Sequence, residues 1–143
     1  MSSLIKYDRS TLQANLTFLI LEDMPTLRMQ LVNDLRSIGI AGEIHEATTL
    51  QEALELMESY SIEFVIADWK LPDGTGIDFL TQFKAKKRNK DVPFIMCTTV
   101  DDIAKILEAV KLGADEYLVK PWKKEELKSK IEFLLNRSRS KLS

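Results

Sequence analysis

The chain has 143 residues, of which 45% are hydrophobic and 29% are charged, and its formal net charge at pH 7 is −2. This length and composition indicate one globular domain, long enough to bury a hydrophobic core. Positive and negative charges nearly balance, so the chain lacks the excess of basic residues that direct nucleic-acid binding requires. No apolar stretch reaches the length of a membrane span. The N-terminal Met1-Ser2-Ser3 does not begin a signal peptide, and the lone Cys97 cannot form an internal disulfide, so we expect a cytoplasmic location.

The first half of the chain alternates apolar runs of strand length with helical patterns. Residues 16–21 form the first apolar run, and Pro25 then opens a helical pattern that stops at Gly39. Residues 43–47 read as a weaker and more exposed strand. Thr49 begins a second helix, because a glutamate follows it at the spacing of a capping box.

The second half continues the same alternation. Three more strands are expected, over residues 64–67, 93–97 and 116–119. A third helix begins at Thr75, where an aspartate follows at capping-box spacing. Asp101 or Asp102 caps a fourth helix, which ends at Gly113, and a fifth helix spans residues 127–134.

Alternating strands and helices, with nearly continuous apolar strands, predict an α/β fold whose parallel sheet is covered by helices on both faces. Right-handed crossovers restrict the possible topologies further. Residues 16–136 form the predicted domain and residues 1–15 an N-terminal arm. Residues 137–143 are a polar C-terminal tail that we expect to fray.

Polar side chains follow four of the five predicted strands. They are Glu22 and Asp23 after the first, Asp68 after the third, Thr98 and Thr99 after the fourth, and Lys120 with Pro121 after the fifth. The carboxyl ends of parallel strands meet at one edge of the sheet, where open α/β sheets bind ligands, so these side chains are expected to converge. Three neighbouring carboxylates need a cation or a proton, and an all-oxygen cluster suits Mg²⁺. A carboxylate beside such a metal can act as a nucleophile toward a phosphoryl group, whose oxygens the hydroxyl and ammonium groups would bind.

Each of these residues has a simpler reading when it is taken alone. Asp68 is then an ordinary loop or capping carboxylate, although Thr75 already occupies the cap position of the next helix. Glu22 and Asp23 can cap the first helix, and Asp23 can serve in both roles. Lys120 can be a solvated loop lysine. Only the complete set, in this order, favours a phosphoryl-transfer site.

The complete set resembles the receiver domain of two-component response regulators, in particular the chemotaxis-regulator-like single-domain receivers. The motifs that carry the resemblance are Glu22-Asp23, Asp68 followed by Leu71-Pro72 and Gly76, Thr98, and Lys120-Pro121. They occur in order between residues 16 and 135, which is nearly the whole chain. The resemblance implies a doubly wound, flavodoxin-like sheet of five parallel strands in the order 2-1-3-4-5, with five helices.

The resemblance also implies how the acidic residues act. Asp68 would be the phospho-acceptor, taking its phosphoryl group from a histidine of a histidine kinase or a phosphotransfer protein. Mg²⁺ would be bound by Asp23, Asp68 and the backbone carbonyl of Lys70. Glu22 would hold a metal-bound water.

Further roles follow from the same resemblance. Thr98 and Lys120 would bind the phosphoryl oxygens, and the Lys120–Pro121 peptide bond would be cis. Tyr117 matches an aromatic switch position whose ring turns inward as Thr98 moves toward the phosphate, although it can equally be a plain packing aromatic. The fourth helix, fifth strand and fifth helix would form the face that binds a downstream protein target.

The sequence departs from the commonest receiver pattern at several positions. The acid pair is Glu-Asp instead of Asp-Asp, which keeps the chemistry. Thr99 replaces a small residue beside the phosphoryl group, and Lys70 places a cation where an attacking water would approach. Trp69 is bulky beside the site. We expect Lys70 and Thr99 to tune the reaction rates.

Three functions are compatible with this pattern. The first is a signalling switch that binds a partner when phosphorylated; its only chemistry is Mg²⁺-dependent self-phosphorylation from a phosphodonor and autodephosphorylation, so it is not a turnover enzyme. The second is the receiver part of a longer regulator with a DNA-binding or enzymatic output domain. The third, an aspartate-nucleophile phosphatase, is less favoured, because those enzymes place a second acid where this chain has Lys70.

Overall fold

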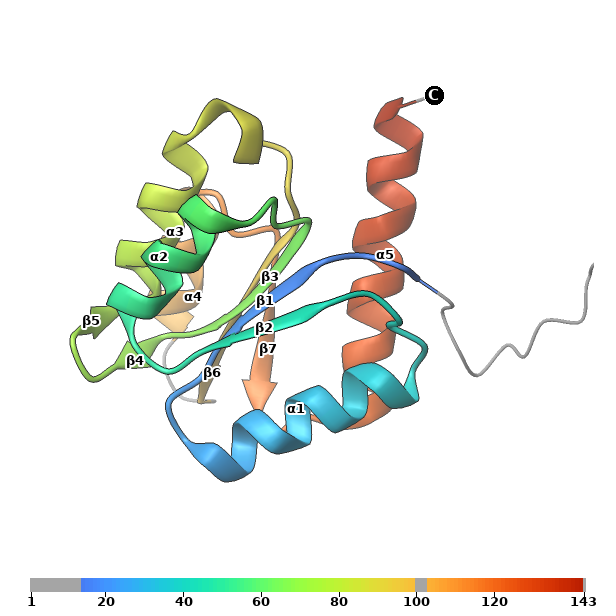
Figure 1. The fold of residues 1–143 in the computed structure, drawn as a ribbon, viewed down its shortest axis with the longest axis horizontal. Coiled ribbons are helices and arrows are strands. Elements are labelled where there is room, and N and C mark those ends of the chain that lie inside the picture. The colour runs from blue at the N-terminus through green and yellow to red at the C-terminus, as the bar shows by residue number, and fades with distance from the viewer. Residues whose placement is uncertain (1–13, 100–102, 143) are drawn as a thin grey trace, which may run out of the picture.

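The computed structural model describes residues 14–99 and 103–142 (Figure 1). The elements in chain order are β1 (Phe18–Leu21), α1 (Pro25–Ser37), β2 (Ile44–Ala47), α2 (Leu50–Ser59), β3 (Phe64–Asp68), β4 (Lys70–Leu71), β5 (Gly74–Thr75), α3 (Gly76–Ala85), η1 (Lys87–Asn89), β6 (Phe94–Thr99), α4 (Ile103–Lys111), β7 (Glu116–Lys120) and α5 (Lys124–Leu142). Every predicted strand and helix is present. The short hairpin β4–β5 and the 3-10 helix η1 lie outside the predicted pattern.

The long strands form one parallel sheet in the order β2-β1-β3-β6-β7, which confirms the expected doubly wound topology. β1 and β3 lie inside the sheet and are buried along their whole length, whereas the edge strand β2 is partly exposed, as its sequence predicts. Helices α1 and α5 cover one face of the sheet, and α2, α3 and α4 cover the other (Figure 1). This arrangement follows from right-handed crossovers on each side of β1.

The two faces of the sheet carry separate hydrophobic cores, because successive side chains of a strand point to opposite faces. On the α1/α5 face, Phe18 and Ile20 pack with Leu35 of α1 and Ile131 of α5. The other core contains three phenylalanine rings, one from β6 and two from α3, with centroids 5.5 to 6.0 Å apart: Phe94, Phe79 and Phe83.

Most predicted helix ends are confirmed. Thr75 and Asp78 form the full capping box of α3, and Gly39 and Gly113 follow α1 and α4 with φ of 108° and 117°, the left-handed region that favours glycine. The capping box of α2 differs from the prediction. The Thr49 hydroxyl accepts the expected hydrogen bond from the Glu52 amide, but the Glu52 carboxylate accepts from the amide of Thr48 instead of that of Thr49. The expected caps Asp101 and Asp102 lie outside the described residues.

The last helix, α5, extends into the predicted C-terminal tail. Helix α5 continues through residue 136 and ends at Leu142. Arg137 donates to the Asp115 carboxylate at 2.7 Å and so ties the first turn of the tail to the loop before β7. Most of the predicted N-terminal arm, residues 1–13, lies outside the described residues; Ala14 bridges to Ile40. No helix in the described parts of the chain combines the length and the hydrophobicity that crossing a bilayer requires.

Candidate functional site

Three charged side chains meet at the carboxyl edge of the sheet. Glu22 follows β1, while Asp68 and Lys120 are the last residues of β3 and β7. The Lys120 ammonium donates to Glu22 Oε1 at 2.7 Å and lies 2.9 Å from Asp68 Oδ2. Both acids are buried, with exposed fractions of 3% for Glu22 and 8% for Asp68. One lysine therefore bridges two carboxylates that are 46 residues apart in the sequence.

Burial and pairing act in opposite directions on these charges. Burial raises the pKa of Glu22 above its ordinary value, although the hydrogen bonds from Lys120 and from the Met24 amide act to lower it. For Lys120, burial acts to lower the pKa, but the hydrogen bonds to Glu22 and Asp68 outweigh it and the pKa is raised. Lys120 is therefore held as a cation at neutral pH, directly beside the expected phospho-acceptor.

Asp23 completes an acidic cluster with Glu22 and Asp68, in which one carboxylate oxygen from each lies within 4.8 Å of the others. The suggestion that Asp23 caps the first helix is wrong, because the cap position is Met24 and no side chain caps it. Instead, Glu22 Oε2 accepts from the Met24 amide at 3.1 Å. Within the residues that the structure describes, no hydrogen bond or ion pair occupies the Asp23 carboxylate. These oxygen donors fit a hard divalent cation.

The loop after Asp68 is a tight hairpin rather than an irregular turn. Lys70 in β4 pairs with Thr75 in β5, and the Gly76 amide donates to the Trp69 carbonyl at 2.7 Å. A Cβ on Gly76 would lie 2.3 Å from the carbonyl oxygen of Asp68, so no other residue fits there without moving the acceptor strand. Asp73 fixes the turn between β4 and β5, a role that was not predicted from the sequence.

Asp73 joins this hairpin to helix α2. Its two carboxylate oxygens accept from the amides of Leu50 and Gln51 at 2.7 and 3.0 Å, in the first turn of the helix. These hydrogen bonds lower the pKa of Asp73. The only sequence signal was an aspartate in a turn, and its partners, 22 and 23 residues earlier, are set by the tertiary fold.

A cavity of about 820 Å³ opens over the acidic cluster. Its lining includes every side chain that was predicted to act on the phosphoryl group, together with apolar and basic neighbours: Asp23, Met24, Leu27, Asp68, Trp69, Lys70, Leu71, Pro72, Thr98, Thr99, Lys105, Lys120 and Pro121. Thr98 is buried and Thr99 and Lys70 are exposed. The Lys105 ammonium from α4 lies 5.5 Å from the centroid of the Trp69 ring; a single helical lysine gave no sequence signal.

The remaining predicted site residues lie on β7 and just after it. The Lys120–Pro121 peptide bond is cis. Strand alternation places Tyr117 on the same face of the sheet as Thr98, and Tyr117 pairs in register with Met96 of β6. Tyr117 is exposed, on the strand β7 at the edge of the sheet.

Comparison with known proteins agrees with this geometry. Residues 18–132 match the response regulator receiver domain. The chain belongs to the response regulator receiver family. It is 36% identical over 121 residues to the chemotaxis protein CheY of Pseudomonas aeruginosa, a match that covers 83% of this chain and 95% of that protein. It is 32% identical over 126 residues to CheY-3 of Vibrio cholerae, covering 88% of this chain and 96% of that protein.

Solved structures place this receiver in the same fold. A putative response regulator from Chloroflexus aurantiacus superposes with a TM-score of 0.80 at 28% identity, covering 85% of this chain and 98% of that one. The chemotaxis response regulator CheY4 of Vibrio cholerae gives 0.77 at 26% identity, covering 85% and 99%. A receiver homologous to these proteins is a component of phosphorylation-activated two-component signalling.

Proposed function

We propose that Asp68 of this receiver accepts a phosphoryl group from a phosphohistidine of a histidine kinase or phosphotransfer protein, and that the phosphorylated form binds a downstream protein. The observation that carries this proposal is the Lys120 ammonium, 2.9 Å from the Asp68 carboxylate at the floor of an open cavity. A buried acid that faces a cavity with a fixed cation beside it is placed for reaction with an anionic group.

The transfer is a displacement at phosphorus. An Asp68 oxygen supplies the electron pair of the new P–O bond, the P–N bond to the donor imidazole breaks, and the nitrogen keeps its electron pair and takes up a proton from water. Lys120 then pairs with a phosphoryl oxygen in addition to Glu22, and the Thr98 hydroxyl donates to another. The protein thus acts on itself and is not a turnover enzyme.

Mg²⁺ is the cofactor that the oxygen-only donor set suits. Asp23, Asp68 and the backbone carbonyl of Lys70 would hold it, with Glu22 bound through a water. When bound, the metal neutralises charge on the transferring group. Glu22 also positions Lys120 in this receiver: one of its carboxylate oxygens accepts from the Lys120 ammonium, and the other accepts from the Met24 amide.

The downstream partner is expected on the face formed by α4, β7 and α5. Helix α4 buries little of its apolar surface: Ile103, Leu107 and Val110 have exposed fractions of 70%, 62% and 50%. Exposed apolar residues at this spacing form a stripe along one side of a helix, of the kind that protein partners cover. We also place the protein in the cytoplasm, where its free thiol at Cys97 would stay reduced.

Incubation of the purified chain with a small phosphodonor and Mg²⁺ tests the assignment. We expect one phosphoryl group, which is lost in base, and peptide mapping should place it on Asp68. Asp68→Asn should not be labelled, whereas Asp91→Asn, which removes an exposed carboxylate before β6, should be labelled like the wild type. Asp23→Ala should retain the fold and need a higher Mg²⁺ concentration. Wild-type labelling of Asp68→Asn would refute the proposal.

A further inference from the structure

Tyr117 lies on an edge strand, so its ring is not enclosed by a neighbouring strand. β7 pairs with β6 on one side only. The side chain of Tyr117 starts on the α4 face, since Leu118, the next residue, belongs to the core on the α1/α5 face. Tyr117 is 36% exposed, and this exposed position of its ring at the open edge of the sheet is called the outward position below.

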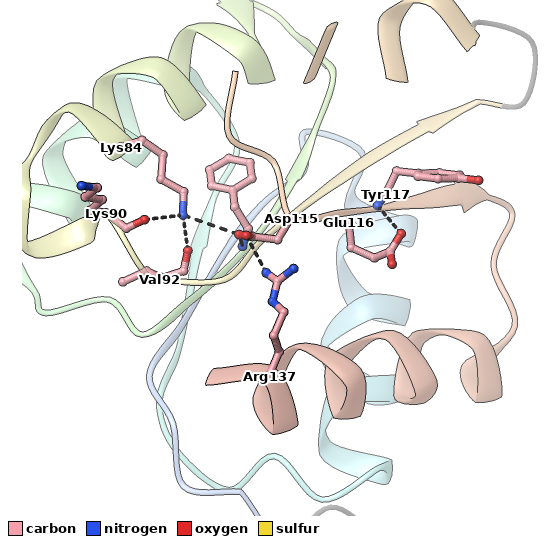
Figure 2. Close-up of polar contacts among 8 residues, drawn as sticks. Lys84, Lys90, Val92, Asp115, Glu116, Tyr117 and Arg137 are labelled. Atoms are coloured by element: carbon pink, nitrogen blue, oxygen red, sulfur yellow. Dashed lines mark hydrogen bonds and ion pairs between the residues drawn. The ribbon is translucent and has the colours of Figure 1, made fainter. Parts of the chain in front are cut away.

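A lysine from the opposite side of the sheet reaches around this edge to the ring. The ammonium of Lys130, in α5, lies 4.6 Å from the centroid of the Tyr117 ring, within the range of a cation–π contact. Glu116 fixes that lysine, because its Oε1 lies 3.1 Å from Lys130 Nζ. The same oxygen accepts from the Tyr117 amide at 3.1 Å (Figure 2).

The position of this contact is specific to the outward ring. Tyr117 is in register with Met96, and Thr98 is the next residue of β6 on the same face. An inward turn would carry the ring over this face toward Thr98 and away from Lys130, whose own backbone is fixed in α5. The cation–π contact therefore stabilises the outward position and is lost in the inward one.

We propose that Lys130 and Glu116 form a latch that holds Tyr117 outward and so sets how readily the receiver switches; this rests on the proposed function and on the expectation, implied by the resemblance to receivers, that phosphorylation of Asp68 favours the inward ring. Lys130 acts through Tyr117 as a positioning residue and does not touch the phosphoryl site. Because binding and ring position are linked, a weaker latch must tighten the binding of any ligand that favours the inward ring.

The test is the affinity for a phosphoryl mimic, beryllium fluoride with Mg²⁺, followed by Trp69 fluorescence. Lys130→Met keeps the aliphatic stem and removes the charge. We expect it to bind the mimic about two- to five-fold more tightly, the range that an exposed cation–π contact supplies. The tyrosine ring resonances of the mimic-free protein should shift as well. Lys87→Met, the same change at the exposed first residue of η1, should leave the affinity unchanged.

A second pair of variants separates the latch from a general effect of charge. In a Tyr117→Ala background, Lys130→Met should no longer alter the affinity, since the latch has nothing to hold. Equal tightening with and without the tyrosine, or no tightening in the single variant, would overturn the latch while leaving the proposed function intact. Wild-type protein that binds no mimic would overturn the proposed function and the latch together.

Discussion

Lys120 shows how one side chain can organise the chemistry of this receiver. Its ammonium is shared between Glu22 and Asp68, and both acids lie on the same sheet face because strand alternation points all three side chains to that side. The longer glutamate in place of an aspartate reaches Lys120 at 2.7 Å while its other oxygen accepts from a backbone amide. The lysine is therefore in place before any phosphoryl group arrives, which reduces the reorganisation that phosphorylation requires.

Lys70 is the exposed residue whose effect on the reaction rate is most open to test. It begins β4 and lines the cavity, and we expect a water that attacks a phosphorylated Asp68 to approach on its side. An ammonium there blocks the approach and cannot accept a proton from water. We predict that Lys70→Asn loses its phosphoryl group a few-fold faster than the wild type at saturating Mg²⁺. Decay of labelled protein measures this, with Lys87→Asn as the control, and an equal or slower decay would contradict it.

At the scale of elements, the hairpin β4–β5 connects the strand that carries Asp68 to helix α2. Gly76 packs against the backbone of β3, and Asp73 links the turn of the hairpin to the first turn of α2. The hairpin is thus held at both ends by contacts that leave little room for adjustment.

Gly76→Ala should disturb the acceptor directly. The new Cβ would lie 2.3 Å from the Asp68 carbonyl oxygen and 2.8 Å from the sulfur of Met96, so backbone must move. We expect a loss of about 1–3 kcal/mol in the free energy of unfolding, as overpacking produces, together with slower phosphorylation. Gly74→Ala is the matched control, since its Cβ meets only the ends of side chains, of which Leu50 is 2.8 Å away. Urea denaturation and labelling of both variants measure the difference; equal effects would refute this account.

Asp73→Asn should change how stability depends on pH. The folded protein lowers the pKa of Asp73 below its ordinary value of 3.8 through hydrogen bonds from the α2 amides. Its stabilising contribution is therefore complete above the unfolded pKa and is lost as the pH falls through the folded one. We predict that the variant is less stable than the wild type at pH 7 and that the difference shrinks below about pH 4. Thermal melts across this range measure it, and a gap that does not vary with pH would exclude the linkage.

At the scale of the whole molecule, the receiver combines a buried site with a more exposed helix α4, which belongs to the proposed partner-binding face. The acidic cluster lies at the ends of buried strands, whereas α4 buries only Ala109 and leaves its apolar stripe in solvent. Elements with few buried apolar contacts change position at low energetic cost. The two parts are joined through β6 and β7, which carry Thr98 and Tyr117.

A phosphoryl mimic at Asp68 should therefore perturb residues far from the metal. We predict changes in the amide NMR shifts of α4 and β7 on saturation with beryllium fluoride and Mg²⁺, while α2 stays nearly fixed. Tyr117→Ala should reduce the changes in α4 without preventing the mimic from binding. Unchanged shifts in α4 and β7 of the saturated wild type would rule out this coupling.

Most of the fold was readable from the sequence, because its signals are local. Each signal depends on only a few neighbouring residues. The apolar runs predicted the strands, and the helix ends were predicted by Pro25, Gly39 and the Thr75 capping box; the structure confirms these predictions. The structure differs from the prediction at the capping box of α2 and in the C-terminal tail. The polar tail was expected to fray, whereas in the structure α5 continues to Leu142 and Arg137 contacts Asp115, 22 residues away.

The sequence by itself determined which chemical groups stand at the strand ends, and the parallel sheet then brought Asp23, Asp68, Thr98 and Lys120 to one cavity. Only the tertiary structure decided which groups are paired there: that Lys120 bridges Glu22 and Asp68, and that Lys130 lies over Tyr117. The physical reason is that strand and helix patterns arise from periodicity along the chain, whereas an ion pair depends on side-chain geometry within a few ångströms between residues that the fold alone makes neighbours.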